Sequence, residues 1–417
     1  MAEIRKVDTA IIGAGLIGSS VAMHLVQMGL SGGEGVRVAD FDLEGALSSS
    51  ELNAGGVRAT WNQPINIEMS RLSIEYFAKH ADDVGYRACG YLWMHGPEKW
   101  ERALAARDRQ LSHGWPVEVW DPAELSRRVP FIDKTSDLAG ALFAPRDGLV
   151  NSNLLKIHFR NEAKKLGAQF EDRLKLKGAT FEADGQIRLV FDQFDRPMTV
   201  EEKLGEIGGG VRQAGIQPRE IVWLAKRVVN CAGPWASEVA RILGYLSPSY
   251  PLRRQICLFD CRDVDLTPYG MMIDPSGVYF HPEASNGLAG FATPDEQQGI
   301  NYHYDGESFF EEIVWPALYE RSTHFERLRH VTGWAGLYEV SPDESSILGQ
   351  VMNGEAGRSG RVFEAHSFSG HGAMHSYAAG QALAEWMIKG KYISLDALPL
   401  NAHRFETGAL IRESLVI

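Results

Sequence analysis

Three glycines near the start of the chain have the spacing of a turn that binds the pyrophosphate of a dinucleotide. They stand in the run Gly13-Ala14-Gly15-Leu16-Ile17-Gly18. In such a turn Gly13 permits the sharp bend, Gly15 lets the backbone approach the pyrophosphate, and Gly18 lets a helix pack closely on a strand. The N-terminus of that helix offers unpaired N–H groups and a positive dipole end, so Leu16 and Ile17 belong to the expected contacts.

An acidic residue stands where this kind of site binds a ribose. Asp40 follows the last glycine by about 20 residues, the usual place for a carboxylate that accepts hydrogen bonds from adenosine hydroxyls. Phe41, next to it, is expected to contact the same ligand.

The elements needed to hold these residues are present in the right order. Residues 7–12 are apolar and β-branched, as in a buried parallel strand, and residues 19–28 have the apolar spacing of a helix. Residues 36–39 read as a second strand that ends at Asp40. The glycine motif alone is weak, because glycine-rich turns that bind nothing also occur, but the whole sequence of elements favours a dinucleotide.

Three later stretches bear on the identity of the dinucleotide. A loop over residues 48–58 is rich in serine and glycine, residues 231–235 form a tight turn after a strand, and residues 369–374 begin a helix. Read alone, the first of these is simply a polar loop. The residues expected to contact the ligand here are Ser48, Ser49, Asn53, Ala54, Gly55, Gly56, Cys231, Ala232, Gly233, Trp235, Gly336, Ser369, Gly370, His371, Gly372, Ala373 and Met374.

Taken together, these stretches resemble the D-amino acid oxidase superfamily of flavoenzymes, in the branch of sarcosine oxidase, glycine oxidase and amine dehydrogenases. The resemblance covers nearly the whole chain. Its motifs are residues 13–18 with Asp40, 229–235, 274–280, 333–337, 342–343 with 347–349, and 368–372.

The resemblance implies an α/β plus α+β architecture: a Rossmann-type FAD-binding domain and a substrate domain built on an antiparallel sheet. The FAD-binding domain is expected to be discontinuous, from residues 1–90, 146–250 and 331–417, and the substrate domain to comprise 91–145 and 251–330. Residues 201–220 resemble a surface insertion.

The resemblance also implies oxidation of an amine or amino acid by hydride transfer to flavin N5, followed by hydrolysis of the imine. Arg58, Tyr279, Tyr338 and His371 are the candidate catalytic residues. Arg58 is expected to hold a substrate carboxylate, with Arg254 and His281 as weaker candidates; contact with the flavin or a structural ion pair is the alternative for Arg58. The backbone N–H groups of residues 370–374 would stabilise charge on the reduced flavin, whereas the His371 side chain could equally be a packed histidine.

The sequence departs from the family at four positions. Ala289 stands where the oxidases have a lysine over the flavin, which favours a dehydrogenase that passes electrons to a protein or a quinone. Met374 and Tyr338 stand where relatives have basic residues for the substrate carboxylate. Gly336 stands where sarcosine oxidase has its attachment cysteine, which predicts noncovalent FAD.

Composition narrows the remaining choices. A net charge of −12 argues against nucleic acid as a partner, and the few cysteines favour a reducing compartment, so we expect a cytoplasmic protein without a transmembrane segment. Cys257 and Cys261 resemble half of a metal site, but no second pair follows, and no metal is expected. The competing functions are a peroxide-producing oxidase, a nicotinamide-dependent dehydrogenase and a non-catalytic flavin-binding assembly protein.

Overall fold

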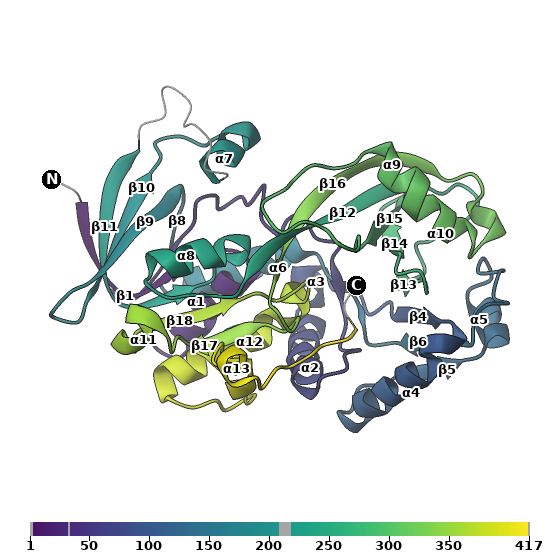
Figure 1. Ribbon diagram of the computed structural model, residues 1–417, viewed down its shortest axis with the longest axis horizontal. Coiled ribbons are helices and arrows are strands. Elements are labelled where there is room, and N and C mark those ends of the chain that lie inside the picture. Colours follow the sequence, from purple (N-terminus) through teal and green to yellow (C-terminus); the bar gives the residue numbers. More distant parts are fainter. Residues whose placement is uncertain (1–2, 32–33, 208–217, 416–417) are drawn as a thin grey trace.

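The chain folds into two lobes, each built on its own eight-stranded sheet (Figure 1). The computed structural model describes residues 3–31, 34–207 and 218–415. Among these residues, no helix has both the length and the apolar character needed to cross a membrane.

The first sheet has a parallel centre, with strand order β17-β18-β11-β1-β2-β8. The second half of strand β1, residues 9–12, is buried because it is flanked on both edges and covered on both faces. Strands β9 and β10 extend the sheet from β11 as an antiparallel hairpin. The strands are β1 (Glu3–Ile12), β2 (Val36–Ala39), β8 (Gln169–Glu171), β9 (Leu174–Phe181), β10 (Ile187–Gln193), β11 (Arg219–Asn230), β17 (Ile347–Gln350) and β18 (Val362–His366).

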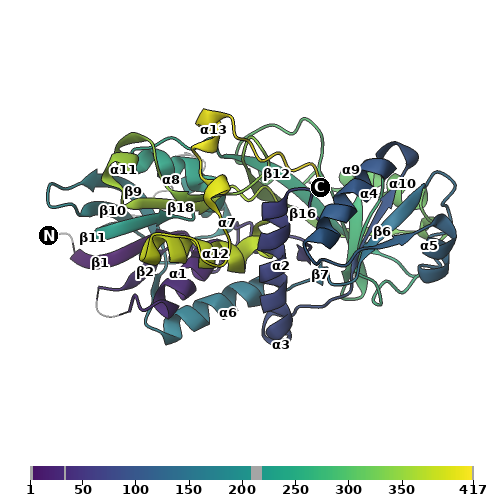
Figure 2. The same ribbon diagram turned by 90° about the horizontal axis from the view of Figure 1, so that it is seen from below.

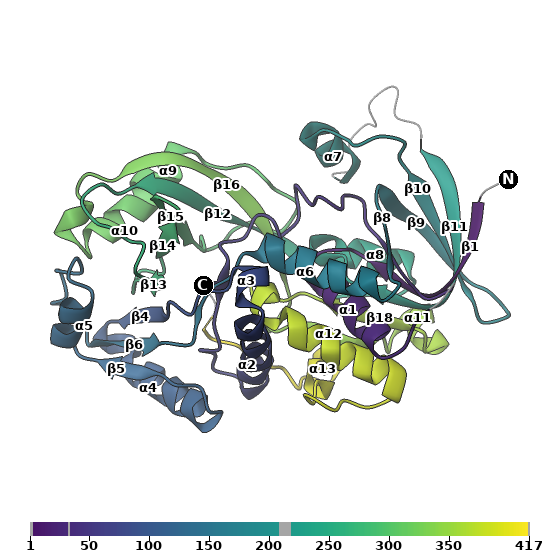
Figure 3. The same cartoon turned by 180° about the vertical axis from the view of Figure 1, so that it is seen from behind.

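Helices cover both faces of this sheet. Helix α1 packs against α6 and α12 on one face, as Figure 2 shows, and α8 packs on the other. Helix α2 packs against α12 and α4 and stands between the two lobes (Figure 3). The helices are α1 (Leu16–Gln27), α2 (Pro64–Lys79), α4 (Pro97–Ser112), α6 (Ser152–Lys165), α8 (Ala236–Ile242) and α12 (Gly372–Lys389).

The second sheet has strand order β16-β12-β15-β14-β13-β4-β6-β5. Every neighbouring pair is antiparallel except β13 with β4, where the two separated chain segments meet. A short two-stranded ladder, β3 with β7, lies beside it. The strands are β3 (Gly56–Val57), β4 (Tyr91–His95), β5 (Glu118–Trp120), β6 (Gly140–Ala144), β7 (Gly148–Leu149), β12 (Tyr250–Asp260), β13 (Met271–Ile273), β14 (Tyr279–Glu283), β15 (Asn286–Phe291) and β16 (Arg329–Val340).

The two faces of the second sheet carry different cores, because side chains alternate along each strand. One face packs against the segment containing α5 (Pro122–Arg128), α9 (Glu307–Phe309) and α10 (Trp315–Tyr319), with Cys257, Phe280 and Ala289 in its core. The other face carries Ile256 and Tyr279 and looks towards the first lobe.

The fold class expected from the sequence is confirmed, and so are its first elements. Strand β2 spans the predicted residues, β1 begins earlier than predicted, and α1 begins at Leu16 rather than Ser19. Of the expected insertion, residues 200–207 form helix α7 (Val200–Ile207), whereas 208–217 lie outside the described residues. The predicted boundaries at 250 and 330 fall inside β12 and β16, and the division into domains stays a prediction.

Candidate active site

A long cavity runs from the carboxyl end of β1 to the inward face of the second sheet. It is lined by residues from segments 12–17, 39–61, 174–176, 231–242, 254–279, 336–339 and 365–374, together with Tyr91, Lys203 and Ile207. Every residue predicted from the sequence to contact the cofactor or the substrate lines this cavity, with the exceptions of Gly18 and of the weaker candidate His281. Their individual roles stay predictions.

The glycine turn forms the floor of one end. Gly13 has φ +104°, and a Cβ there would lie 2.2 Å from the carbonyl oxygen of Cys231. A Cβ on Gly18 would lie 1.9 Å from the carbonyl oxygen of Gly13. Gly18 therefore serves packing within the turn, which explains why it does not line the cavity.

Asp40 fastens this turn to the end of β2. Its carboxylate accepts hydrogen bonds from the backbone N–H groups of Ala14 and Asp42. Burial raises the pKa of Asp40 above its ordinary value. Phe41, the next residue, lines the cavity and packs edge-on against Phe194 at 5.6 Å between ring centroids.

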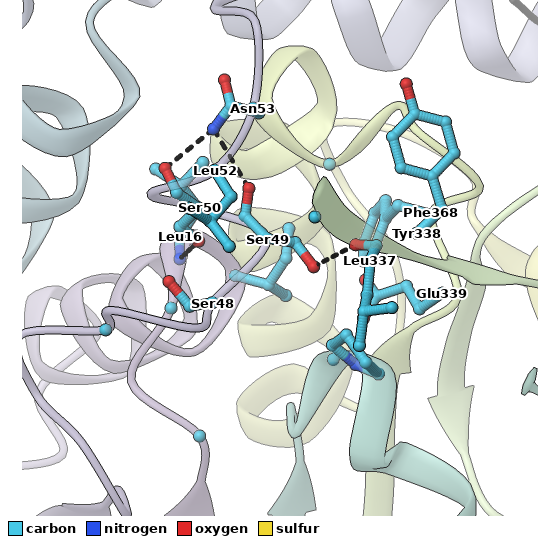
Figure 4. Close-up of a pocket in the computed structure, with 18 of the residues that line it drawn as sticks. Leu16, Ser48, Ser49, Ser50, Leu52, Asn53, Leu337, Tyr338, Glu339 and Phe368 are labelled. Carbon is cyan, nitrogen blue, oxygen red and sulfur yellow. Dashed lines mark hydrogen bonds between the residues drawn. The ribbon is translucent and has the colours of Figure 1, made fainter. Parts of the chain in front are cut away.

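The serine-rich loop after β2 is tied to both lobes (Figure 4). The N–H of Leu16 donates to Ser50 Oγ at 3.1 Å, and Ser49 Oγ donates to the carbonyl of Leu337 in β16 at 2.6 Å. Asn53 Nδ2 donates to the carbonyls of Ser49 and Ser50, so its amide shapes the loop. Ser48 Oγ is buried without a hydrogen-bond partner.

The start of α12 lies at the other end of the cavity. The N–H groups of Gly372, Ala373 and Met374 occupy the first turn, where no helix carbonyl can pair with them. Ser369 (φ +49°) and Gly370 (φ +88°) lead into the helix through the left-handed region. The positive φ is unfavourable for Ser369, which is not a glycine. The turn is closely packed, since a Cβ on Gly370 would lie 2.5 Å from the Tyr338 ring.

His371 is buried in this turn, and neither ring nitrogen has a hydrogen-bond partner. Its ring lies 3.9 Å from the ring of Trp61, centroid to centroid. Burial holds the pKa of His371 well below its ordinary range, and burial lowers that of neighbouring His375 to about 3. Both imidazoles are therefore neutral near pH 7.

Arg58 is 3% exposed and lines the same end. Its guanidinium carbon stands 3.4 Å above the Trp61 ring, and the group donates to the carbonyls of Thr60 and Leu415. Burial lowers its pKa to about 10, so it stays charged at neutral pH. Among the described residues, no carboxylate lies within ion-pair distance of it.

Three tyrosines and a second arginine complete this end. Tyr91, Tyr279 and Tyr338 line the cavity, and Arg254 from β12 stands over Tyr338 with its guanidinium carbon 5.1 Å from the ring centroid. The sequence did not single out Tyr91 or Trp61, because an aromatic residue in a strand or loop carries no signal of its facing a cavity.

Two expectations from the sequence need correction. Ala289 packs with Cys257 and Phe280 on the outer face of the second sheet, so a lysine there would not point into the cavity. The absence of a lysine at position 289 therefore does not distinguish a dehydrogenase from an oxidase. His281 is buried, bonds the carbonyl of Pro282 and does not line the cavity.

The lining fits FAD in two respects. Two helix N-termini with free N–H groups face the cavity, at α1 and α12, which suits an anion at each. Buried polar atoms without partners, Ser48 Oγ, Trp235 Nε1 and Arg254 Nε, line the space between them. The described residues contain no group of three His, Cys, Asp or Glu side chains that could hold a metal.

Comparison with known proteins agrees with this fit. The chain is 26% identical to FAD-dependent oxidoreductase domain-containing protein 1 of Xenopus laevis, covering 96% of this chain and 83% of the relative. It is 23% identical to mitochondrial dimethylglycine dehydrogenase of Homo sapiens, covering 96% of this chain and 44% of that protein.

Solved structures show the same fold. The L-proline dehydrogenase of P. horikoshii superposes with TM-score 0.76 and 22% identity, over 99% of this chain and all of the other. Glycine oxidase from Geobacillus kaustophilus gives TM-score 0.74 and 20% identity, over 96% and 99%. Residues 8–386 match the DAO family, described as FAD dependent oxidoreductase, and the chain therefore belongs to this family.

Proposed function

We propose that the protein is a dehydrogenase that oxidises the C–N bond of an amine bearing a carboxylate, such as a secondary or N-methyl amino acid. The observation that carries the proposal is the buried, unpaired guanidinium of Arg58 beside the start of α12. A charged group buried without a counter-ion is unfavourable unless a ligand supplies one.

The other buried arginines show how unusual Arg58 is. Arg321 pairs with Asp274 at 2.7 Å and with Asp137 at 2.8 Å. Arg404 pairs with Asp343 at 2.7 Å. Of the three arginines that are almost fully buried in the described parts of the chain, Arg58 alone has no carboxylate within ion-pair distance, and it lines the cavity.

Arg58 and the residues around it would each have a role in the reaction. Arg58 would fix the substrate carboxylate and so hold the α-carbon and the amine in one orientation. The neutral imidazoles of His371 and His375 add no positive charge, which favours the uncharged amine that can lose a hydride. When bound, FAD supplies the acceptor for that hydride. The amine nitrogen gives up a proton, and water then hydrolyses the resulting imine to a carbonyl compound and a free amine.

Two residues that line the cavity support noncovalent attachment of FAD. Gly336, at the position of the attachment cysteine in sarcosine oxidase, offers no nucleophile. Among the described residues that line the cavity, Cys231 is the single cysteine. Burial raises the pKa of its thiol. A buried neutral thiol is a poor nucleophile.

An oxidase is the second candidate, and Arg58 favours it too. A fixed cation near the flavin would stabilise superoxide as oxygen is reduced. The dehydrogenase is preferred because no lysine lines this end of the cavity among the described residues: Lys175 and Lys203 lie at the nucleotide end, where Lys203 pairs with Asp42. The acceptor of a dehydrogenase would be a quinone or an electron-carrier protein.

An anaerobic substrate screen tests the proposal. The purified flavoprotein is mixed with sarcosine, proline or hydroxyproline, and the loss of flavin absorbance near 450 nm is followed. We expect at least one amino acid to bleach the flavin, and Arg58→Met to raise its half-saturating concentration about 10- to 100-fold, the effect of losing a charge-assisted hydrogen bond.

Two controls separate binding from folding. The ratio of flavin to protein absorbance reports whether Arg58→Met still holds the cofactor, and Arg58→Lys keeps the charge while losing the bidentate fork. If no amine or amino acid reduces the flavin of the wild-type protein, the proposed function is wrong.

A further inference from the structure

We propose that the substrate carries two carboxylates, one bound by Arg58 and the other by Arg254. The inference rests on the proposed function and specifies its substrate class. It starts from an arginine on β12 that the amine-oxidation reaction does not by itself require.

Arg254 faces the cavity from the second sheet, opposite Gly336 of β16 in the strand register. Its Nε is buried without a hydrogen-bond partner, and one Nη donates to the neighbouring Arg253 carbonyl at 3.0 Å. Leu52 packs against Gly336, since a Cβ on Gly336 would lie 3.1 Å from the Cβ of Leu52. In the described structure no carboxylate lies within ion-pair distance of this guanidinium.

The adjacent residue makes the contrast clear. Arg253 pairs with Glu296 at 3.0 Å and with Asp305 at 2.9 Å, and it does not line the cavity. Successive residues of a strand point to opposite faces, so β12 carries a structural arginine on one face and a cavity arginine on the other. Arg254 is thus left without the partners that its neighbour has.

The charges of both guanidinium groups influence the pKa of the same residue, Tyr338. Burial raises the pKa of Tyr338, while the charges of Arg254 and Arg58 both act to lower it. The guanidinium carbon of Arg254 lies 5.1 Å from the centroid of the Tyr338 ring, and both arginines line the end of the cavity that Tyr91 and Tyr279 also line. A substrate bound there meets two positive charges.

A ligand with two carboxylates matches this arrangement. A monocarboxylate would leave one of the two guanidinium groups without a counter-ion, which sites built on charge pairs disfavour. A planar guanidinium donates two parallel hydrogen bonds to a carboxylate, and this geometry also fixes the orientation of the carboxylate. An amine with a carboxylate on each side would be held at both ends, with the C–N bond between them.

An ion pair with Glu344 would be another explanation for the presence of Arg254. Its pKa responds to the charge of Arg254, although burial is the larger influence and raises it. The side chain lies outside ion-pair distance of Arg254 and is exposed to solvent. If Arg254 served to pair with Glu344, then Glu344→Gln would have the same effect as loss of Arg254.

The test compares matched substrates in the anaerobic assay. N-methylaspartate carries two carboxylates at the shorter separation, iminodiacetate and N-methylglutamate carry two at a longer separation, and sarcosine and proline carry one. We expect at least one dicarboxylate to bleach the flavin at a half-saturating concentration about 10- to 100-fold below that of sarcosine. Arg254→Met should abolish this preference, because it should raise the half-saturating concentration of the dicarboxylate about 10- to 100-fold more than that of sarcosine, whereas Arg253→Met and Glu344→Gln should preserve it.

A binding measurement separates the two proposals. Succinate and glutarate should raise the melting temperature of the holoprotein more than butyrate does, and Arg254→Met should remove the difference. Inorganic phosphate is a further probe, and stabilisation by phosphate alone would overturn the dicarboxylate assignment.

If sarcosine and the dicarboxylates behave alike in both assays, the second carboxylate site is wrong and the proposed function stands. If no amine reduces the flavin but the dicarboxylates stabilise the protein through Arg254, the proposed reaction is wrong and the two-carboxylate site stands.

Discussion

Asp147 holds the segment that carries Arg58, although it does not line the cavity. Its carboxylate accepts hydrogen bonds from the N–H of Ala59 at 2.8 Å, from Thr60 Oγ1 at 3.1 Å and from Trp115 Nε1 at 2.8 Å. Burial raises the pKa of Asp147 to about 7 against these donors. A residue that only positions Arg58 thus titrates near neutral pH.

Replacing Asp147 with Asn should change how stability depends on pH. In the unfolded chain an Asp has a pKa near 3.9, and folding raises that of Asp147 to about 7, so the folded state binds the proton more tightly. The stability gained from this proton is complete below the unfolded pKa and is lost as pH rises towards 7. Relative to the wild type, Asp147→Asn should therefore gain about 1.4 kcal/mol for each pH unit between pH 5 and 7.

Urea unfolding at pH 5, 6 and 7 measures this difference. Asp137→Asn is the control, because the hydrogen bond and charge of Arg321 lower the pKa of Asp137 and both states are ionised throughout this range. A constant difference between Asp147→Asn and the wild type would show that Asp147 is ionised in the folded protein.

At this scale the sequence predicted the residues that belong to motifs. Arg58 could be named because it ends a glycine-rich loop. Arg254 could be only a weak candidate, because nothing in the run Arg253-Arg254 shows which guanidinium meets Glu296 and which meets the cavity. Asp147 gave no signal, since its three donors come from two other segments of the chain.

Among the elements, the turn between β1 and α1 depends most on glycine. Gly13 combines a positive φ with contact against the turn that follows β11. Gly29, just after α1, has φ +95° but no atom within 4 Å of the position a Cβ would take. The two glycines therefore share a backbone conformation and differ in packing.

This pair gives a matched test of the nucleotide turn. Gly29→Ala should lower the free energy of unfolding by about 1–2 kcal/mol, the strain of a left-handed alanine, and keep its flavin. Gly13→Ala adds a backbone clash and should lose most of the bound flavin, measured as the ratio of absorbance at 450 nm to that at 280 nm. Equal flavin content in the two variants would contradict the packing role of Gly13.

Local elements were the most predictable part of the fold. The strand, turn, helix and strand from β1 to β2 follow from patterns within one short segment. The second sheet was expected only from the family resemblance, because its strands pair across long stretches of chain. For the same reason the side to which Ala289 points could not be read from the sequence, since one residue of register decides the face.

At the scale of the whole molecule, the electron acceptor of the reduced flavin decides between a dehydrogenase and an oxidase. The cavity joins both lobes, and its end beside the start of α12 carries Arg58 and Arg254 but no lysine among the described lining residues. We expect turnover of a reducing substrate in air to yield less than a tenth of an equivalent of hydrogen peroxide per substrate oxidised. A quinone or a dye should restore turnover.

A peroxide assay coupled to a peroxidase, run beside dye reduction, measures this yield. Arg58→Lys is an informative comparison, because an ammonium group in that place would assist oxygen reduction. Stoichiometric peroxide from the wild type would identify an oxidase and leave the amine chemistry unchanged.

The parallel contact between β4 and β13 has a consequence for how the second lobe is held together. Only three residue pairs join these strands, Tyr91 with Met271, Leu92 with Met272 and Trp93 with Ile273, whereas β12 and β16 pair along eleven. Closing the long intervening chain is entropically unfavourable, and few backbone hydrogen bonds offset it here. This junction should exchange its amide hydrogens before the long ladder of β12 with β16, and because Tyr91 and Met271 line the cavity, a substrate bound there would slow the exchange.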